Sequence, residues 1–104
     1  MIYIDNEKDL DELVKEGVTI VDFYADWCGP CRMLSTVIDE LAFENDTVKF
    51  AKVNVDDSAD LARKYRISAI PAIFFFKDGK LVKNEVGFKT LDDLKELLEE
   101  VNGK

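Results

Sequence analysis

The chain has 104 residues, a length that fits one domain with a single hydrophobic core. Its net charge is −8, from 22 acidic and 14 basic residues, which argues against nucleic acid or an anionic membrane surface as a partner. With 2 cysteines and no histidine, the sequence lacks the roughly four ligands that a structural zinc site needs, and we expect no metal and no organic cofactor.

The first part of the chain predicts an edge strand, an amphipathic helix and a central strand. Residues Ile2–Ile4 suit a short edge strand. Asn6 suits the N-cap of a helix, and Gly17 fits the C′ position at its end. Val18–Ala25 is almost continuously apolar, which is typical of a strand covered on both faces. The helix has an apolar stripe made by Leu10, Leu13 and Val14.

Asp22 interrupts the apolar strand. It could face solvent on a half-exposed strand. Burial is favoured, because the flanking residues Ile20, Val21, Phe23 and Tyr24 leave no polar face. A buried carboxylate usually has a partner or a chemical role.

The segment Trp27–Cys31 follows this strand and contains both cysteines. A helix N-terminus carries unpaired N–H groups and a partial positive charge, which together stabilise a thiolate. Pro30 suits the first turn of a helix, and Gly29 leaves the approach to Cys28 open. We therefore expect an exposed, activated sulfur on Cys28, one helical turn before Cys31. The spacing that predicts the helix is that of Cys31, Leu34, Ile38, Leu41 and Ala42.

Three other interpretations of the cysteine pair are weaker. A zinc site would lack ligands. A purely structural disulfide would close a very small loop and constrain little of the unfolded chain. Two unrelated buried thiols have no reason to flank Gly29 and Pro30. Redox chemistry is the favoured interpretation.

The second part of the chain predicts a helix to about Asn45, a strand at Val48–Val55 that carries Lys52, and a short helix. Asp56, Asp57 and Ser58 are expected to cap that short helix. Its inner face is expected to consist of Leu61, Ala62 and Tyr65.

The last part predicts a hairpin and a final helix. Pro71 precedes the strand Ala72–Lys77, and Asp78 with Gly79 suits a type I′ turn. The return strand, Leu81–Val86, ends at Gly87. Thr90 and Asp93 resemble a capping box for a helix that ends near Asn102 and Gly103. Its apolar face is made by Leu91, Leu94, Leu98 and Val101.

The order βαβαβα followed by ββα predicts an α/β fold with a mixed five-stranded sheet between about four helices. The segment Val21–Met33 resembles the active-site segment of the thioredoxin family, which is a standard example of a redox-active Cys-x-x-Cys pair. The resemblance covers essentially the whole chain and implies one thioredoxin domain over residues 1–104. Further segments match in order and spacing: Lys52–Asp56, Ile70–Ala72, Phe76–Gly79 and Val86–Gly87.

The resemblance implies a protein-disulfide reductase that acts as an electron carrier. In that mechanism Cys28 attacks a substrate disulfide and Cys31 resolves the mixed disulfide. Asp22 would accept the proton of Cys31, near Lys52, although Lys52 could equally extend to solvent. Thr36 occupies the place of a proline that usually kinks the family's helix, so the sequence departs from the family pattern at this position. The implied docking surface for substrate peptides consists of Trp27, Gly29, Pro30, Ile70, Pro71 and Gly87.

Three of these docking residues have plainer alternatives. Trp27 could serve packing only, and Gly87 could be required only for a positive φ. The resemblance implies a cis peptide bond before Pro71, whereas a trans proline at the start of a strand is the ordinary alternative.

The resemblance also implies partners: substrate proteins with disulfides and a thioredoxin reductase. We expect a monomer. The sequence shows no signal-peptide pattern and no apolar run of membrane-spanning length, so we expect a cytoplasmic protein.

Two alternative functions are an oxidising or isomerising domain of the same fold, which often has a histidine between the cysteines, and a binding subunit that uses the fold as a docking platform.

Overall fold

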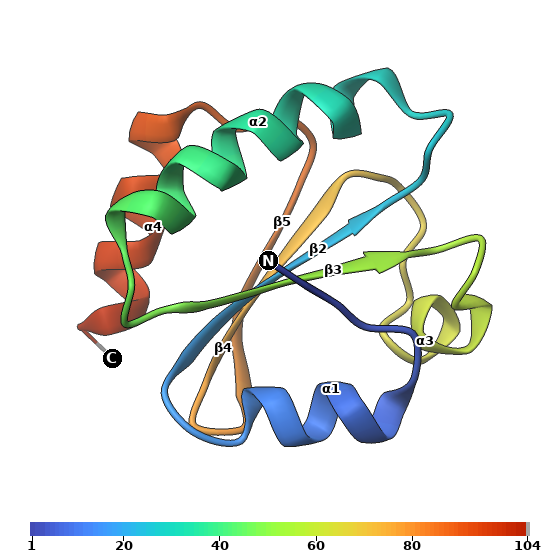
Figure 1. The fold of residues 1–104 in the computed structure, drawn as a ribbon, viewed down its shortest axis with the longest axis horizontal. Coiled ribbons are helices and arrows are strands. Elements are labelled where there is room, and N and C mark those ends of the chain that lie inside the picture. Colours follow the sequence, from blue (N-terminus) through green and yellow to red (C-terminus); the bar gives the residue numbers. More distant parts are fainter. Residues whose placement is uncertain (104) are drawn as a thin grey trace.

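A mixed five-stranded sheet runs through the middle of the molecule, with strand order β1-β3-β2-β4-β5. The structure is a computed structural model and describes residues 1–103. Helices α2 and α4 cover one face of the sheet, and α1 and α3 lie on the other (Figure 1). The elements are β1 (Ile2–Tyr3), α1 (Glu7–Val14), β2 (Val18–Tyr24), α2 (Gly29–Glu44), β3 (Lys49–Asn54), α3 (Ala59–Lys64), β4 (Ala72–Lys77), β5 (Lys80–Val86) and α4 (Leu91–Asn102).

Strand β2 is the centre of the sheet. It pairs in parallel with β3 and antiparallel with β4, so that Asp22 lies between Lys52 on one side and Ile73 on the other. Parallel β1 and antiparallel β5 form the two edges. The predicted α/β fold with a mixed five-stranded sheet is confirmed. Within residues 1–103, no helix is both long enough and apolar enough to cross a membrane.

Side chains alternate along β2 and fill two separate cores. Val21 and Phe23 point toward α1 and α3, where they pack with Leu10 and Leu61. Ile20 points the other way, into the core beneath α2 and α4. Asp22 shares the face of Ile20, so its carboxylate lies under α2.

The predicted turns and caps between these elements are mostly confirmed. Asp78 and Gly79 both have positive φ, as a type I′ turn requires. Thr90 and Asp93 form the expected capping box at the start of α4. Helix α2 runs unbroken past Thr36 to Glu44.

Two local predictions were wrong. Helix α1 ends at Val14 with Lys15 as C-cap, so Gly17 lies beyond the C′ position and instead forms the turn into β2, with φ of 72°. Ser58 is the N-cap of α3, but its side chain caps nothing. The backbone N–H groups of Asp56 and Asp57 donate instead to Asn54 Oδ1. Asn54 is the last residue of β3, and an Asn side chain readily accepts hydrogen bonds from the backbone two or three residues further on.

Candidate active site

The two cysteines lie at the start of α2, as the sequence predicts. Cys28 is the N-cap, the helix begins at Gly29, and Pro30 lies in the first turn. The Sγ atom of Cys28 accepts a hydrogen bond from the backbone N–H of Cys31 over 3.2 Å. This donor is one of the unpaired N–H groups of the helix end, and the helix dipole adds to its field. The same arrangement stabilises negative charge on the sulfur when Cys28 is reduced.

Cys28 and Cys31 form a disulfide, with their Cα atoms 5.2 Å apart. The expectation of an exposed Cys28 sulfur was wrong for this oxidised form. Cys28 is 5% exposed and Cys31 is 2% exposed. The reason is packing: the pair lies in a small cluster with Ala25, lined by Tyr24, Val55 and Ile70.

Trp27 is the exposed group beside the disulfide, with 70% of its surface accessible. Its indole Nε1 donates to Asp56 Oδ2 over 2.9 Å, which ties the ring to the turn that follows β3. Trp27 and Ile70 line one shallow pocket of about 170 Å³ with Ile67. The structure therefore brings these two predicted docking residues together. Asp56 and Ile67 were missed as site residues, because the matched motifs do not say which side chains meet Trp27 across the fold.

Two of the remaining docking residues, Pro71 and Gly87, are linked through the backbone. The Ile70–Pro71 bond is cis, as the resemblance implied. The N–H of Gly87 donates to the carbonyl of Pro71 over 2.8 Å, so the end of β5 is joined to the start of β4. Gly87 has φ of 94°, which supports the plainer explanation of this glycine without excluding the other. Its role in docking stays a prediction, as do the docking roles of the other five residues of this surface.

Asp22 is fully buried, as predicted. Neither of its carboxylate oxygens has a hydrogen-bond partner among residues 1–103. Burial raises the pKa of Asp22 from 3.8 to about 7, although the positive charge of Lys52 acts in the opposite direction. Near neutral pH this carboxyl can therefore both accept and release a proton.

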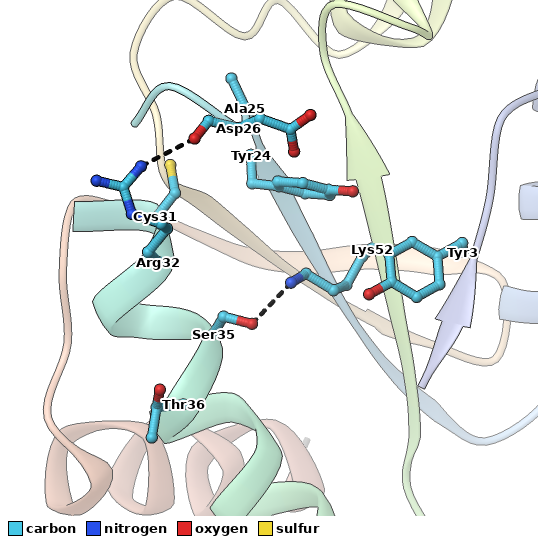
Figure 2. A pocket seen from close by; sticks show the side chains of 9 residues that line it. All are labelled: Tyr3, Tyr24, Ala25, Asp26, Cys31, Arg32, Ser35, Thr36 and Lys52. Carbon is cyan, nitrogen blue, oxygen red and sulfur yellow. Dashed lines mark hydrogen bonds between the residues drawn. The ribbon is translucent and has the colours of Figure 1, made fainter. Parts of the chain in front are cut away.

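Lys52 lies beside Asp22, as one of its two predictions has it: the two residues are opposite each other on β3 and β2, and the charge of Lys52 acts on the pKa of Asp22. Lys52 is only 8% exposed, so it does not extend freely to solvent. Its Nζ donates to Ser35 Oγ over 2.7 Å and lies 4.5 Å from the centre of the Tyr24 ring. Figure 2 shows this ammonium at the wall of a pocket of about 330 Å³, which Cys31 also lines. Ser35 was missed, although its place four residues after Cys31 puts both on one helix face.

No group of three or more His, Cys, Asp or Glu side chains within residues 1–103 is placed to hold a metal ion. The chemistry that the geometry offers is that of the two sulfurs at the start of α2, with the buried carboxyl of Asp22 on the face of β2 that α2 covers.

The chain resembles known proteins over almost its full length. The thioredoxin family model matches residues 2–100. A thioredoxin of Mycoplasmoides gallisepticum is 40% identical over 99 residues, which cover 94% of this chain and 99% of the relative. A thioredoxin of Bacillus subtilis is 44% identical over 84 residues, 80% of this chain and 81% of the relative.

Solved structures show the same similarity to thioredoxins. A mutant thioredoxin from Halobacterium salinarum superposes with a TM-score of 0.90 at 39% identity, covering 95% of this chain and 88% of that one. Thioredoxin of Fasciola hepatica gives a TM-score of 0.90 at 38% identity, covering 96% and 98%. The chain therefore belongs to the thioredoxin family, whose members are disulfide reductases that work through a Cys-x-x-Cys dithiol.

Proposed function

We propose that Cys28 is the attacking thiol and Cys31 the resolving thiol in the reduction of disulfides of substrate proteins. The Cys28 thiolate attacks one sulfur of the substrate disulfide, forms a mixed disulfide and releases the other substrate sulfur as a thiolate. The Cys31 thiolate then attacks Cys28 Sγ, releases the second substrate thiolate and leaves the Cys28–Cys31 disulfide. The observation that carries this assignment is the N-cap position of Cys28 at α2, with its sulfur bonded to the Cys31 N–H.

Asp22 is proposed to take the proton that Cys31 loses before it attacks. Two observations support this role: the carboxyl lies under α2 in a site with no competing hydrogen-bond donor among residues 1–103, and its pKa is about 7. A base with a pKa near the working pH is well suited to accept a proton and pass it on.

Substrate proteins are proposed to dock on Trp27, Gly29, Pro30, Ile70, Pro71 and Gly87. The exposed indole of Trp27 supports this surface, because aromatic anchors beside a shallow apolar pocket are favoured at interfaces.

A thioredoxin reductase is proposed to return the disulfide to the dithiol. The proposed compartment is the cytoplasm, where thiols are kept reduced and a reductant of this kind can act repeatedly.

Equilibration of the Cys28–Cys31 couple with glutathione buffers tests the function. A reductase should have a potential more negative than about −220 mV, so that the dithiol can reduce disulfides in a glutathione-buffered compartment. A potential near about −180 mV or above would instead indicate an isomerase or oxidase. The variant with both cysteines replaced by serine should lose insulin reduction completely. Full biological activity without both cysteines would indicate a binding subunit.

A further inference from the structure

Lys52 and Asp22 are neighbours that are not paired. They lie opposite each other on the adjacent strands β3 and β2. An ammonium and a carboxylate in such positions ordinarily meet as an ion pair, especially when both are buried. Within residues 1–103, however, no cationic nitrogen lies within 4.0 Å of the Asp22 carboxylate, and neither carboxylate oxygen accepts a hydrogen bond.

The Lys52 ammonium is held elsewhere. Its Nζ donates to Ser35 Oγ over 2.7 Å, and Ser35 lies on α2, one turn after Cys31. The rings of Tyr24 and Tyr3 are 4.5 Å and 5.9 Å from the same nitrogen. Figure 2 shows Ser35 at the ammonium end of the Lys52 side chain, with Tyr24 and Tyr3 beside that side chain. These contacts stabilise the ammonium on the side of the pocket.

We propose that Ser35 is a positioning residue for the redox reaction: its hydroxyl holds the Lys52 ammonium on the pocket side and thereby leaves the Asp22 carboxyl without a cationic partner. Asp22 then remains a proton acceptor. An Asp22 fixed in a close ion pair would stay ionised at neutral pH and would be a much weaker base. The inference rests on the proposed role of Asp22 as acceptor and adds the group that keeps it available.

Among the groups around Asp22, Lys52 is the charged group whose position Ser35 can set. Strand β3 contributes Lys52. Helix α2 covers this face of the sheet, and Cys31 in its first turn is in the disulfide and does not titrate in the oxidised protein. Strand β4 contributes the apolar Ile73. Tyr24 and Asp26 follow along the same chain segment. Of these groups, Lys52 is the one whose charge acts on the pKa of Asp22, and it lowers that pKa.

The first test measures the pKa of Asp22 in the oxidised protein, from the pH dependence of its side-chain carboxyl ¹³C shift. Ser35→Ala should lower this pKa by about 1 unit, because the released ammonium can approach the carboxylate. Alanine is the better helix former, so α2 should remain folded. Ser35→Thr keeps the hydroxyl and should leave the pKa near its original value. Thr36→Val removes a neighbouring hydroxyl of the same pocket that is not a partner of Lys52 and should have no effect.

A second pair of variants tests whether Ser35 acts on the pKa of Asp22 through Lys52. In a Lys52→Met background, Ser35→Ala should no longer change the pKa of Asp22. An unchanged or raised pKa in Ser35→Ala alone would overturn the proposal, and so would an equal shift in the absence of Lys52. In the dithiol, the lower midpoint of the pH–rate profile for insulin reduction should move down with the pKa. Because the titration uses the oxidised protein and needs no turnover, its result is independent of whether the proposed reaction is correct.

Discussion

Cys28 Sγ accepts a hydrogen bond from the backbone N–H of Cys31, so the two cysteines have unequal positions at the start of α2. Cys28 is the N-cap, outside the first turn, whereas Cys31 lies within the helix and faces the sheet. The N–H groups of the helix end therefore act on the first sulfur and favour its thiolate.

This asymmetry predicts selective alkylation. When the reduced protein is exposed briefly to iodoacetamide near neutral pH, Cys28 should be labelled well before Cys31, because only its sulfur is stabilised as a thiolate by the helix end. Peptide mapping by mass spectrometry gives the ratio. Equal labelling of the two residues would show that their proposed roles are wrong.

Asp22→Ala should stabilise the fold at alkaline pH. The pKa of this buried carboxyl is raised from 3.8 to about 7, so protonated Asp22 contributes stability below about pH 4 that is lost as the pH rises to about 7. Above that window the loss amounts to about 4 kcal/mol, at about 1.4 kcal/mol for each pKa unit. Alanine leaves a cavity that costs about 1–2 kcal/mol. A net gain of about 2 kcal/mol should appear in denaturant unfolding at pH 9.

The same comparison at pH 3 is the control for that variant. Both states of the wild-type protein hold the Asp22 proton there, so only the cavity cost should remain and the alanine variant should be the less stable one. Insulin reduction by the variant should be slower at neutral pH. A variant that is less stable at pH 9 and equally fast would mean that Asp22 is a paired structural residue.

Arg66→Gly should stabilise the protein by about 0.5–1 kcal/mol. Arg66 has φ of 55°, just after the C-cap of α3, where its N–H donates to Arg63 O and the N–H of Ile67 donates to Ala62 O. This is the position at which a helix end usually has glycine, since a Cβ is strained in the left-handed region. Thermal or denaturant unfolding gives the change.

Arg66→Ala separates backbone strain from the loss of charge. It removes the guanidinium but keeps the Cβ, and it should leave stability nearly unchanged. Should alanine stabilise the protein as much as glycine does, the gain would come from the side chain and the strain argument would fail.

Trp27→Ala should weaken docking of protein substrates. The expected loss is about tenfold in kcat/KM for insulin, corresponding to about 1.4 kcal/mol, and it should fall mainly on KM. Reduction of a small aromatic disulfide should change little, because it makes few contacts beyond the sulfurs. Asp56→Ala removes the hydrogen bond but keeps the indole ring, so its effect should be smaller. If both disulfides slowed equally in Trp27→Ala, the ring would be serving the structure of the site.

Sequence patterns predicted the features that depend on local chemistry. The apolar run Val18–Ala25 predicted the central strand and the burial of Asp22, and Asp78 with Gly79 predicted the hairpin turn. In each case the residues that decide the structure are neighbours in the chain.

Features that depend on tertiary contacts could not be predicted in this way. The bond from Lys52 to Ser35 spans 17 positions, and the bond from Trp27 to Asp56 spans 29. The burial of Cys28 depends on Val55 and Ile70, which the fold brings to the disulfide from two other segments. Periodicity assigns such residues to faces of elements, but it does not say which partners they meet.

Trapping of the mixed disulfide tests the central claim most directly. Reduced Cys31→Ser should accumulate a covalent adduct with oxidised insulin, because Cys28 can attack and nothing resolves the product. Mass mapping of the acid-quenched adduct should place the new bond on Cys28, and reduced Cys28→Ser should form little adduct under the same conditions. No adduct with Cys31→Ser, together with a stable adduct through Cys31 in Cys28→Ser, would contradict the account.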